Sequence, residues 1–373
     1  MSSRLPRLAL AAWSLAAVLV AALVAAVWHF LAAAPDSRDM PAMHALTRAG
    51  ATNPTRPLTS ALLSAWQLDA VAVAVLVLAG AAYLTGVALV PLRSPGVVWP
   101  VRRTLAFFGG LAVGAFATNG SIAVYDQVLF TAHMAGHLAL VMVAPALLMW
   151  GRPIGLALAA SPEERRARWE RRLRGPVVSV LSAPPVALAS YAAVIVGSHL
   201  TGLMDTIMRN GWAGQVEHLV YVLVGCQFFA LVVGDEPLRW RLASPTRWVL
   251  LAIAMAVDTF TGIVLMQGTH AIALLPSALH VDALSDTRTG GAIMWFGGDA
   301  IMALIMVGLV VGWLRTADFA SAEQGWLEQA RVTAFNAHTG SDDGAGPAAI
   351  DADDDAARAA YNQWLAKLDA RGR

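Results

Sequence analysis

The sequence predicts an all-α protein that crosses a membrane several times. Its 373 residues are 57% hydrophobic and 14% charged, whereas soluble domains carry about 25% charged residues. The mean hydropathy is +0.59. Several apolar runs also reach the ~18 residues that mark a transmembrane helix. The fold class is therefore a polytopic helical membrane protein of about eight transmembrane helices.

Eight apolar runs are the expected spans. They cover about residues 8–33, 69–91, 103–119, 128–150, 179–198, 214–234, 247–268 and 291–314. Ala32, Ala33 and Ala34 resemble a signal-peptide cleavage site, but the run before them is long, which favours a retained helix. The expected organisation is a first helix and outer loop (1–64), a seven-helix membrane domain (65–315) and a cytosolic tail with two short helices (316–373).

Arginine placement predicts the orientation, because cytoplasmic loops are rich in basic residues. Loops on one side hold Arg4, Arg7, Arg93, Arg102, Arg103, Arg152, Arg165, Arg166, Arg168, Arg171, Arg172, Arg174, Arg239, Arg241 and Arg247. Loops on the other side hold Arg38, Arg48, Arg56, Arg209 and Arg288. Both termini are therefore expected on the cytoplasmic side of the membrane.

The charged segments predict few partners besides lipid. Residues 161–175 form a predicted basic surface helix that begins with a capping box from Ser161 to Glu164 and touches anionic lipid. The net charge of +1 predicts no nucleic-acid partner. A cytosolic partner for the 316–373 tail is left open.

Histidines gather on the outer side of this topology. His29, His44, His133, His137, His199, His218, His270 and His280 fall there, and only His338 falls inside. His133 and His137 stand at positions i and i+4, so they share one helix face. Glu217 precedes His218, and Asp126 and Asp286 also lie on the outer side.

These residue types indicate a copper site outside the reducing cytosol. Imidazole suits copper and zinc, and the methionine thioether selects Cu(I). Met134 and Met294 belong to the same outer half. The single cysteine, Cys226, excludes a thiolate cage within one chain. The alternative is that each histidine is structural, satisfied by water or backbone. For Asp258, inside a span, the alternatives are a hydrogen bond to a neighbouring helix or proton relay.

Other chemistry is disfavoured. The HMAGH sequence has the histidine spacing of zinc proteases but lacks their glutamate general base. A P-loop, a GxSxG motif and histidines spaced for stacked haems are also missing from the sequence. The protein is therefore expected not to be an enzyme.

Four blocks resemble the multi-pass CtaG family of cytochrome c oxidase assembly proteins. They are HMAGHLALVMVAPALLMWGRP (133–153), SHL (198–200), VEHLVYVLVG (216–225) and SDTRTGGAIMW (285–295). The resemblance covers about residues 65–315. It implies that His133, Met134, His137, His199, Glu217, His218, Asp286 and Met294 match the family's motif residues.

The resemblance implies a role in oxidase assembly in a bacterial plasma membrane, with copper delivered at the extracytoplasmic face to the nascent haem-copper oxidase subunit. The hypothesis is transient Cu(I) binding by His133, His137, His199 and His218, with Asp286 and Met294 as secondary ligands or gates. Two alternatives stay open, namely copper transport or tolerance along a polar path past Asp258, and electron transfer through haem.

Overall fold

A computed structural model of the protein describes residues 66–126, 128–209, 211–272, 281–315 and 362. The predicted first span (8–33), the two predicted tail helices, and His29, His44, His280 and His338 lie outside the described residues. Residues 1–306 form one compact unit and residues 307–373 form a second. The helices and the site described below belong to the first unit, apart from the last turns of α17.

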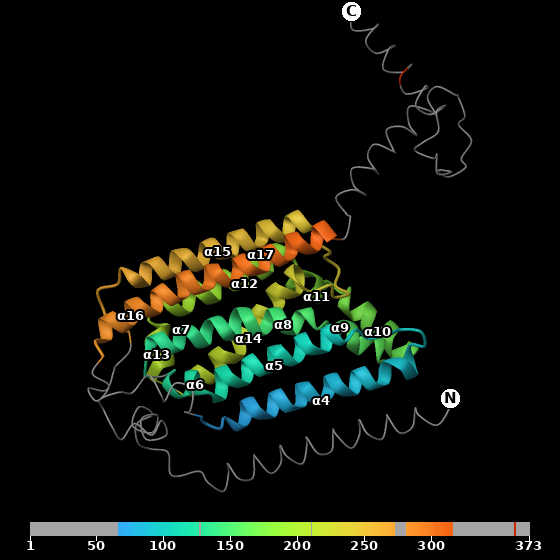
Figure 1. Ribbon diagram of the computed structural model, residues 1–373, viewed down its shortest axis with the longest axis horizontal. Coiled ribbons are helices and arrows are strands. Elements are labelled where there is room, and N and C mark those ends of the chain that lie inside the picture. Colours follow the sequence, from blue (N-terminus) through green and yellow to red (C-terminus); the bar gives the residue numbers. More distant parts are fainter. Residues whose placement is uncertain (1–65, 127, 210, 273–280, 316–361, 363–373) are drawn as a thin grey trace, which may run out of the picture. The chain divides into compact units, whose positions relative to one another are not determined.

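Figure 1 shows the described helices in chain order. Their bounds are α4 Ala70–Arg93, α5 Val101–Asn119, α6 Ser121–Tyr125, α7 Phe130–Leu138, η1 Ala139–Val143, α8 Ala144–Trp150, α9 Pro153–Ala159, α10 Glu163–Leu173, α11 Pro176–Leu181, α12 Pro184–His199, α13 Leu203–Arg209, α14 Gly211–Val232, α15 Ser244–Met266, α16 Ala283–Ala292, η3 Ile293–Gly297 and α17 Gly298–Arg315. The described residues contain helices and no strand, which confirms the predicted all-α fold class.

Six stretches in the described part are long and apolar enough to cross a membrane. They are Ala70–Arg93, Val101–Tyr125, Phe130–Ala159, Ala213–Val232, Ser244–Met266 and Ala283–Leu314. They coincide with six of the eight predicted spans. The prediction of one continuous helix over 179–198 is wrong, because α11 ends at Leu181 and α12 begins at Pro184. A proline supplies no backbone donor and restrains the residue before it, so the helix breaks there.

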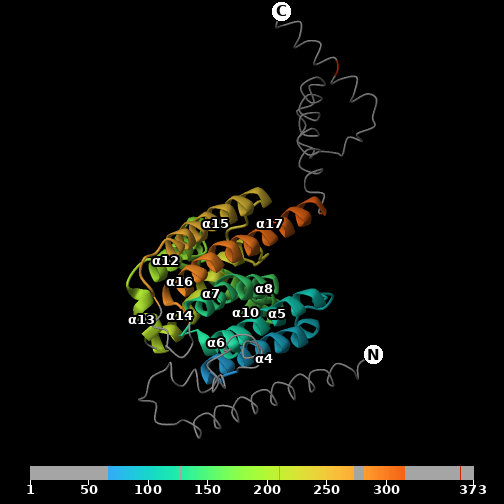
Figure 2. The ribbon, with the colours of Figure 1, turned by 60° about the vertical axis from the view of Figure 1, so that its left-hand side comes forward.

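Five helical segments close a ring around the interior of the bundle. The continuous α7–η1–α8 segment packs on α14, α14 packs on α12, and α12 packs on α15. The ring closes because α15 packs on α16 and α16 packs back on α7. Helices α4 and α5 add a layer outside α8, on the same side in both views (Figures 1 and 2). Side chains on the inner faces of the ring are thus shielded from lipid as well as from water.

Glycine allows one close approach that shapes this ring. A side-chain carbon at Gly225 of α14 would collide with the carbonyl oxygen of Val141 and lie 2.6 Å from Cγ of Pro145. The α14 backbone therefore lies directly against η1 and α8. This contact presents the preceding turns of α14, which carry Glu217 and Tyr221, to the histidine face of α7.

Two π-helical turns interrupt long helical segments of the bundle. Turn η1 (Ala139–Val143) follows the His137 turn of α7, and η3 (Ile293–Gly297) follows α16. A π-turn adds a residue to the helical repeat and occurs often at functional sites. Here η1 changes the helix register directly after the histidine pair.

The end of the bundle away from the histidines has an irregular loop between α8 and α9. Arg152 adopts a left-handed backbone conformation (φ 53°). The carboxylate of Glu236 accepts hydrogen bonds from the backbone N–H groups of Ile154 (3.1 Å) and Gly155 (2.8 Å). Burial, the largest effect, raises the pKa of Glu236, and the two backbone donors oppose that shift. Glu236 thereby fixes the start of α9.

The predicted basic surface helix is present as α10, but its predicted capping box is wrong. Within the described residues the N-cap of α10 is Pro162, which makes no side-chain capping bond. The Ser161 hydroxyl instead donates to the carbonyl of Ala157 in the preceding helix (2.7 Å). No residue of α10 is buried within the described part of the chain, so the prediction of a surface helix is confirmed.

Candidate metal-binding site

The two histidines of α7 face the interior of the ring. His133 is 2% exposed and His137 is 1% exposed, so neither is an interfacial side chain in contact with solvent. The start of α7 is fixed by Asp286 of α16. Its carboxylate accepts bonds from the backbone N–H groups of Phe130 (2.7 Å) and Thr131 (3.3 Å) and from the Thr131 hydroxyl (2.5 Å).

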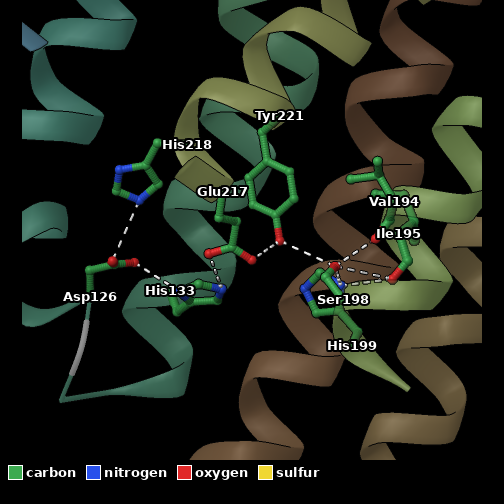
Figure 3. A network of polar contacts seen from close by, with 9 residues as sticks. All are labelled: Asp126, His133, Val194, Ile195, Ser198, His199, Glu217, His218 and Tyr221. Atoms are coloured by element: carbon green, nitrogen blue, oxygen red, sulfur yellow. Dashed lines mark hydrogen bonds and ion pairs between the residues drawn. The ribbon is translucent and has the colours of Figure 1, made fainter. Parts of the chain in front are cut away.

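Asp126 connects two of the histidines (Figure 3). Nδ1 of His133 donates to Oδ1 of Asp126 at 3.0 Å, and Nε2 of His218 lies 3.5 Å from Oδ2. A carboxylate only accepts, so the His133 proton resides on Nδ1. Nε2 of His133 then carries the lone pair when the ring is neutral. Carboxylates orient metal-binding histidines in this way in many proteins.

A second chain of contacts orients His199 of α12. Nδ1 of His199 donates to the carbonyl oxygen of Ile195 at 2.9 Å and lies 2.8 Å from Oγ of Ser198. The Ser198 hydroxyl lies 3.3 Å from the hydroxyl of Tyr221, which donates to Oε1 of Glu217 (Figure 3). The carbonyl of Ile195 only accepts. Nε2 of a neutral His199 therefore also has a free lone pair.

Four histidines in the described part of the chain have ring nitrogens that lack hydrogen-bond partners, and three of their rings, those of His133, His137 and His199, lie close together. Among the described residues, Nε2 of His133, both ring nitrogens of His137, Nε2 of His199 and Nδ1 of His218 are buried with no hydrogen-bond partner. The ring centroids of His137 and His199 are 4.7 Å apart, and those of His133 and His199 are 6.3 Å apart. Each buried polar group without a partner costs about 1–3 kcal/mol. Such a cluster is expected to hold a ligand that accepts nitrogen lone pairs.

A preformed cage for a metal with three or more ligands is not found. In the described part of the chain no three His, Cys, Asp or Glu side chains are grouped closely enough to hold one ion. The geometry instead offers a pair of imidazoles, His137 and His199, with His133 farther away. A soft monovalent ion needs fewer ligands than Zn²⁺, which is usually tetrahedral.

The other residues predicted for the site differ in where they lie. Met134 and Met294 are fully buried, and Met134 lies against Gly290 of α16, 3.1 Å from the place of a side-chain carbon there. The carboxylate of Asp286 accepts its hydrogen bonds from the first residues of α7. Glu217 lies inside the network, with Oε2 at 3.6 Å from Nε2 of His133. Ligand roles for Met134, Met294, Glu217 and Asp286 stay predictions.

The site contains two residues that sequence reasoning did not include. Tyr221 and Ser198 join Glu217 to His199. The signal for Tyr221 was its position four residues after Glu217, which places both on one helix face. Asp258, for which two roles were left open, accepts a hydrogen bond from the hydroxyl of Tyr191 (2.9 Å). That bond to a neighbouring helix is confirmed.

Comparisons with known proteins agree with the resemblance noted in the sequence. The family model described as cytochrome c oxidase caa3 assembly factor (Caa3_CtaG) matches residues 81–316. Uncharacterized proteins of Mycobacterium leprae and Mycobacterium bovis are each 30% identical to the chain, over 279 and 276 residues. These matches cover 70% of this chain and 41% of each relative, so the chain spans less than half the length of these relatives. No solved structure matches the chain significantly.

Proposed function

The chain belongs to the cytochrome c oxidase caa3 assembly factor family, and on that premise we propose that it passes Cu(I) to an oxidase subunit during assembly. The observation that carries the copper part is the set of buried, unpartnered imidazole nitrogens on His133, His137 and His199. Copper is the cargo of this reaction and not a resident cofactor. The partner is the haem-copper oxidase subunit that receives the ion.

The chemistry of the site suits transfer better than storage. His137 and His199 supply two neutral nitrogen ligands, and His133 supplies a third from one helical turn away. An ion held by two strong ligands can be taken over by a partner that offers more. Asp126 and Ile195 keep Nδ1 of their histidines protonated, so that Nε2 is the atom that binds.

The proposed orientation places the histidines at the extracytoplasmic face. The arginine-rich segments, including α10, would then lie in the cytoplasm, together with the chain termini. Copper would be received and released outside the reducing cytosol. Cysteine labelling at exposed positions tests this orientation. A cysteine replacing Arg165 should be protected in intact cells from a reagent that cannot cross the membrane, and one replacing His270 should be labelled.

The function is tested by the metal content of the oxidase. A bacterial strain lacking this gene would be complemented with the wild type, with His137→Ala, or with His270→Ala as an exposed-histidine control. We expect wild type and His270→Ala to restore oxidase copper, and His137→Ala to leave the oxidase protein poor in copper. Equal oxidase copper in all three strains, at matched membrane levels of the variants, would contradict the proposal.

Copper transport or tolerance is the second candidate, and one observation favours it. Asp258 is fully buried in a predicted span, and one of its oxygens has no partner among the described residues. Thr259 donates to Asp299 nearby (2.9 Å). Transport predicts that Asp258→Asn changes cellular copper accumulation. The delivery proposal predicts unchanged accumulation and unchanged oxidase copper.

A further inference from the structure

Tyr221 contacts both the carboxylate of Glu217 and the histidine pair His137 and His199. Its hydroxyl donates to Oε1 of Glu217, and its ring is 1% exposed. The centroid of that ring lies 4.5 Å from His137. The plane of the Tyr221 ring is inclined by 9° to that of the His199 ring, and the two ring centroids are 6.5 Å apart. In Figure 3 the hydroxyl of Tyr221 points between Glu217 and Ser198, the neighbour of His199.

One oxygen of Glu217 is hydrogen-bonded by Tyr221, and the other has no hydrogen-bond partner among the described residues. Tyr221 holds Oε1, and Oε2 faces Nε2 of His133 at 3.6 Å. The second carboxylate of the network, on Asp126, is engaged by His133 and His218. The rings in contact with His137 are those of His199 and Tyr221, and Tyr221 carries no negative charge while its hydroxyl donates to Glu217.

The charge of the ligands decides which ion such a buried pair can accept. Burying a charge is costly unless an opposite charge accompanies it, and the cost grows steeply for a divalent ion. Zn²⁺ and Cu²⁺ bind well to mixed imidazole and carboxylate ligands. Cu⁺ carries half that charge and tolerates neutral, soft ligands. A carboxylate that swung into the site would therefore favour the divalent ions.

We infer that Tyr221 determines the metal selectivity of the site by holding Glu217 away from the His137–His199 pair. This inference rests on the proposed function and names the residue that makes the site selective for Cu(I). Tyr221 is a positioning residue, since it acts through Glu217. Its loss would free a carboxylate within reach of the ion.

Tyr191 supplies a matched control in the same bundle. It is also fully buried, and its hydroxyl also donates to a carboxylate, Oδ2 of Asp258 at 2.9 Å, although Asp258 lies on another helix whereas Glu217 and Tyr221 lie on the same one. Tyr191→Phe thus removes the same hydroxyl from the same kind of contact, away from the histidine pair. Any general effect of unpairing a buried carboxylate will appear in both variants.

The experiment compares the dissociation constants of Cu(I) and Zn(II) for the full-length protein in detergent, measured anaerobically against competing chelators. For Tyr221→Phe we expect the preference for Cu(I) to fall by about tenfold or more, chiefly through tighter Zn(II) binding. X-ray absorption of the zinc-loaded variant should show an added oxygen ligand. Tyr191→Phe should keep the wild-type preference.

Removing the charge of Glu217 provides the second variant. Glu217→Gln retains an acceptor for Tyr221, so its Cu(I) affinity should stay within about threefold of wild type. The double variant Tyr221→Phe/Glu217→Gln should lose the gain in Zn(II) affinity. A large loss of Cu(I) affinity in Glu217→Gln would make Glu217 a ligand and overturn the inference, even if Tyr221→Phe fails to fold.

The outcomes separate this inference from the proposed function. If the wild type binds no Cu(I), the proposed function fails and the inference fails with it. If the wild type binds Cu(I) but Tyr221→Phe keeps the wild-type preference, only the inference fails.

Discussion

The contact at Gly225 is expected to control both stability and the site. In Gly225→Ala, the added methyl group would overlap the carbonyl oxygen of Val141 and lie 2.6 Å from Cγ of Pro145. Backbone cannot yield as a flexible side chain does. Overpacking of this kind costs about 1–3 kcal/mol, and the better helix propensity of alanine returns about 0.5–1 kcal/mol. A net loss of about 1–2 kcal/mol is therefore expected.

The same change should weaken the site, because α14 would have to move away from η1. Tyr221 and Glu217 lie on the α14 turns before the contact and would withdraw from His137. Thermal unfolding in detergent measures the stability change. At roughly 2–4 °C per kcal/mol for a chain of 150–250 residues, Tm should fall by several degrees.

Gly197→Ala is the matched control for Gly225→Ala. Gly197 also lies in a helix, but none of the described atoms lies within 4 Å of the place of its side-chain carbon. This variant should keep or slightly raise Tm, because alanine favours the helix without a clash. If Gly225→Ala is as stable as Gly197→Ala, the close approach of α14 to η1 is refuted, and with it the account of how the site is assembled.

Three further substitutions test other parts of the structure. Asp286→Ala removes the charged cap of α7, so a loss of about 1.5–3 kcal/mol is expected in thermal unfolding; an unchanged Tm would contradict the capping role. Glu236→Ala should cost about 1–3 kcal/mol, because two buried N–H groups lose their acceptor. At the neighbouring position, Asp235→Ala breaks a partly exposed ion pair with Arg152 and should lower the stability by at most ~1 kcal/mol. Equal losses of stability in the two variants would contradict the role of Glu236 at the start of α9. Asp126→Asn should weaken Cu(I) binding about 10–100-fold, because outer-shell partners orient metal-binding histidines; unchanged affinity would exclude that role.

The fold class followed from the sequence because lipid imposes a strong constraint. A long apolar run must satisfy its backbone internally, so it becomes a helix. The helix break at Pro184, inside the 179–198 run, was not predicted because a hydropathy pattern contains no information about backbone hydrogen-bond donors. The predicted capping box of α10 was wrong because the Ser161 hydroxyl donates instead to the carbonyl of Ala157 in the preceding helix.

The site was predictable in its residue types and less so in its contacts. His133 and His137 share a face by their spacing alone. That His199 meets them depends on how α12 packs in the ring, which no local pattern contains. Asp286 illustrates the same limit. It was predicted as a secondary ligand or gate, yet the bonds it makes are to the start of a helix about 150 residues away in sequence. The spacing of Tyr221 from Glu217 was visible in the sequence, but its contact with Ser198 of another helix was not.

The most direct measurement is the Cu(I) stoichiometry and affinity of the detergent-purified protein, with a competing Cu(I) chelator. It compares the wild type with His133→Ala/His137→Ala and with His270→Ala. The account predicts about one Cu(I) bound by the wild type and by His270→Ala, and none by the double variant. If all three bind Cu(I) equally, or if none does, the histidine cluster is not a copper site and the proposed delivery role is contradicted.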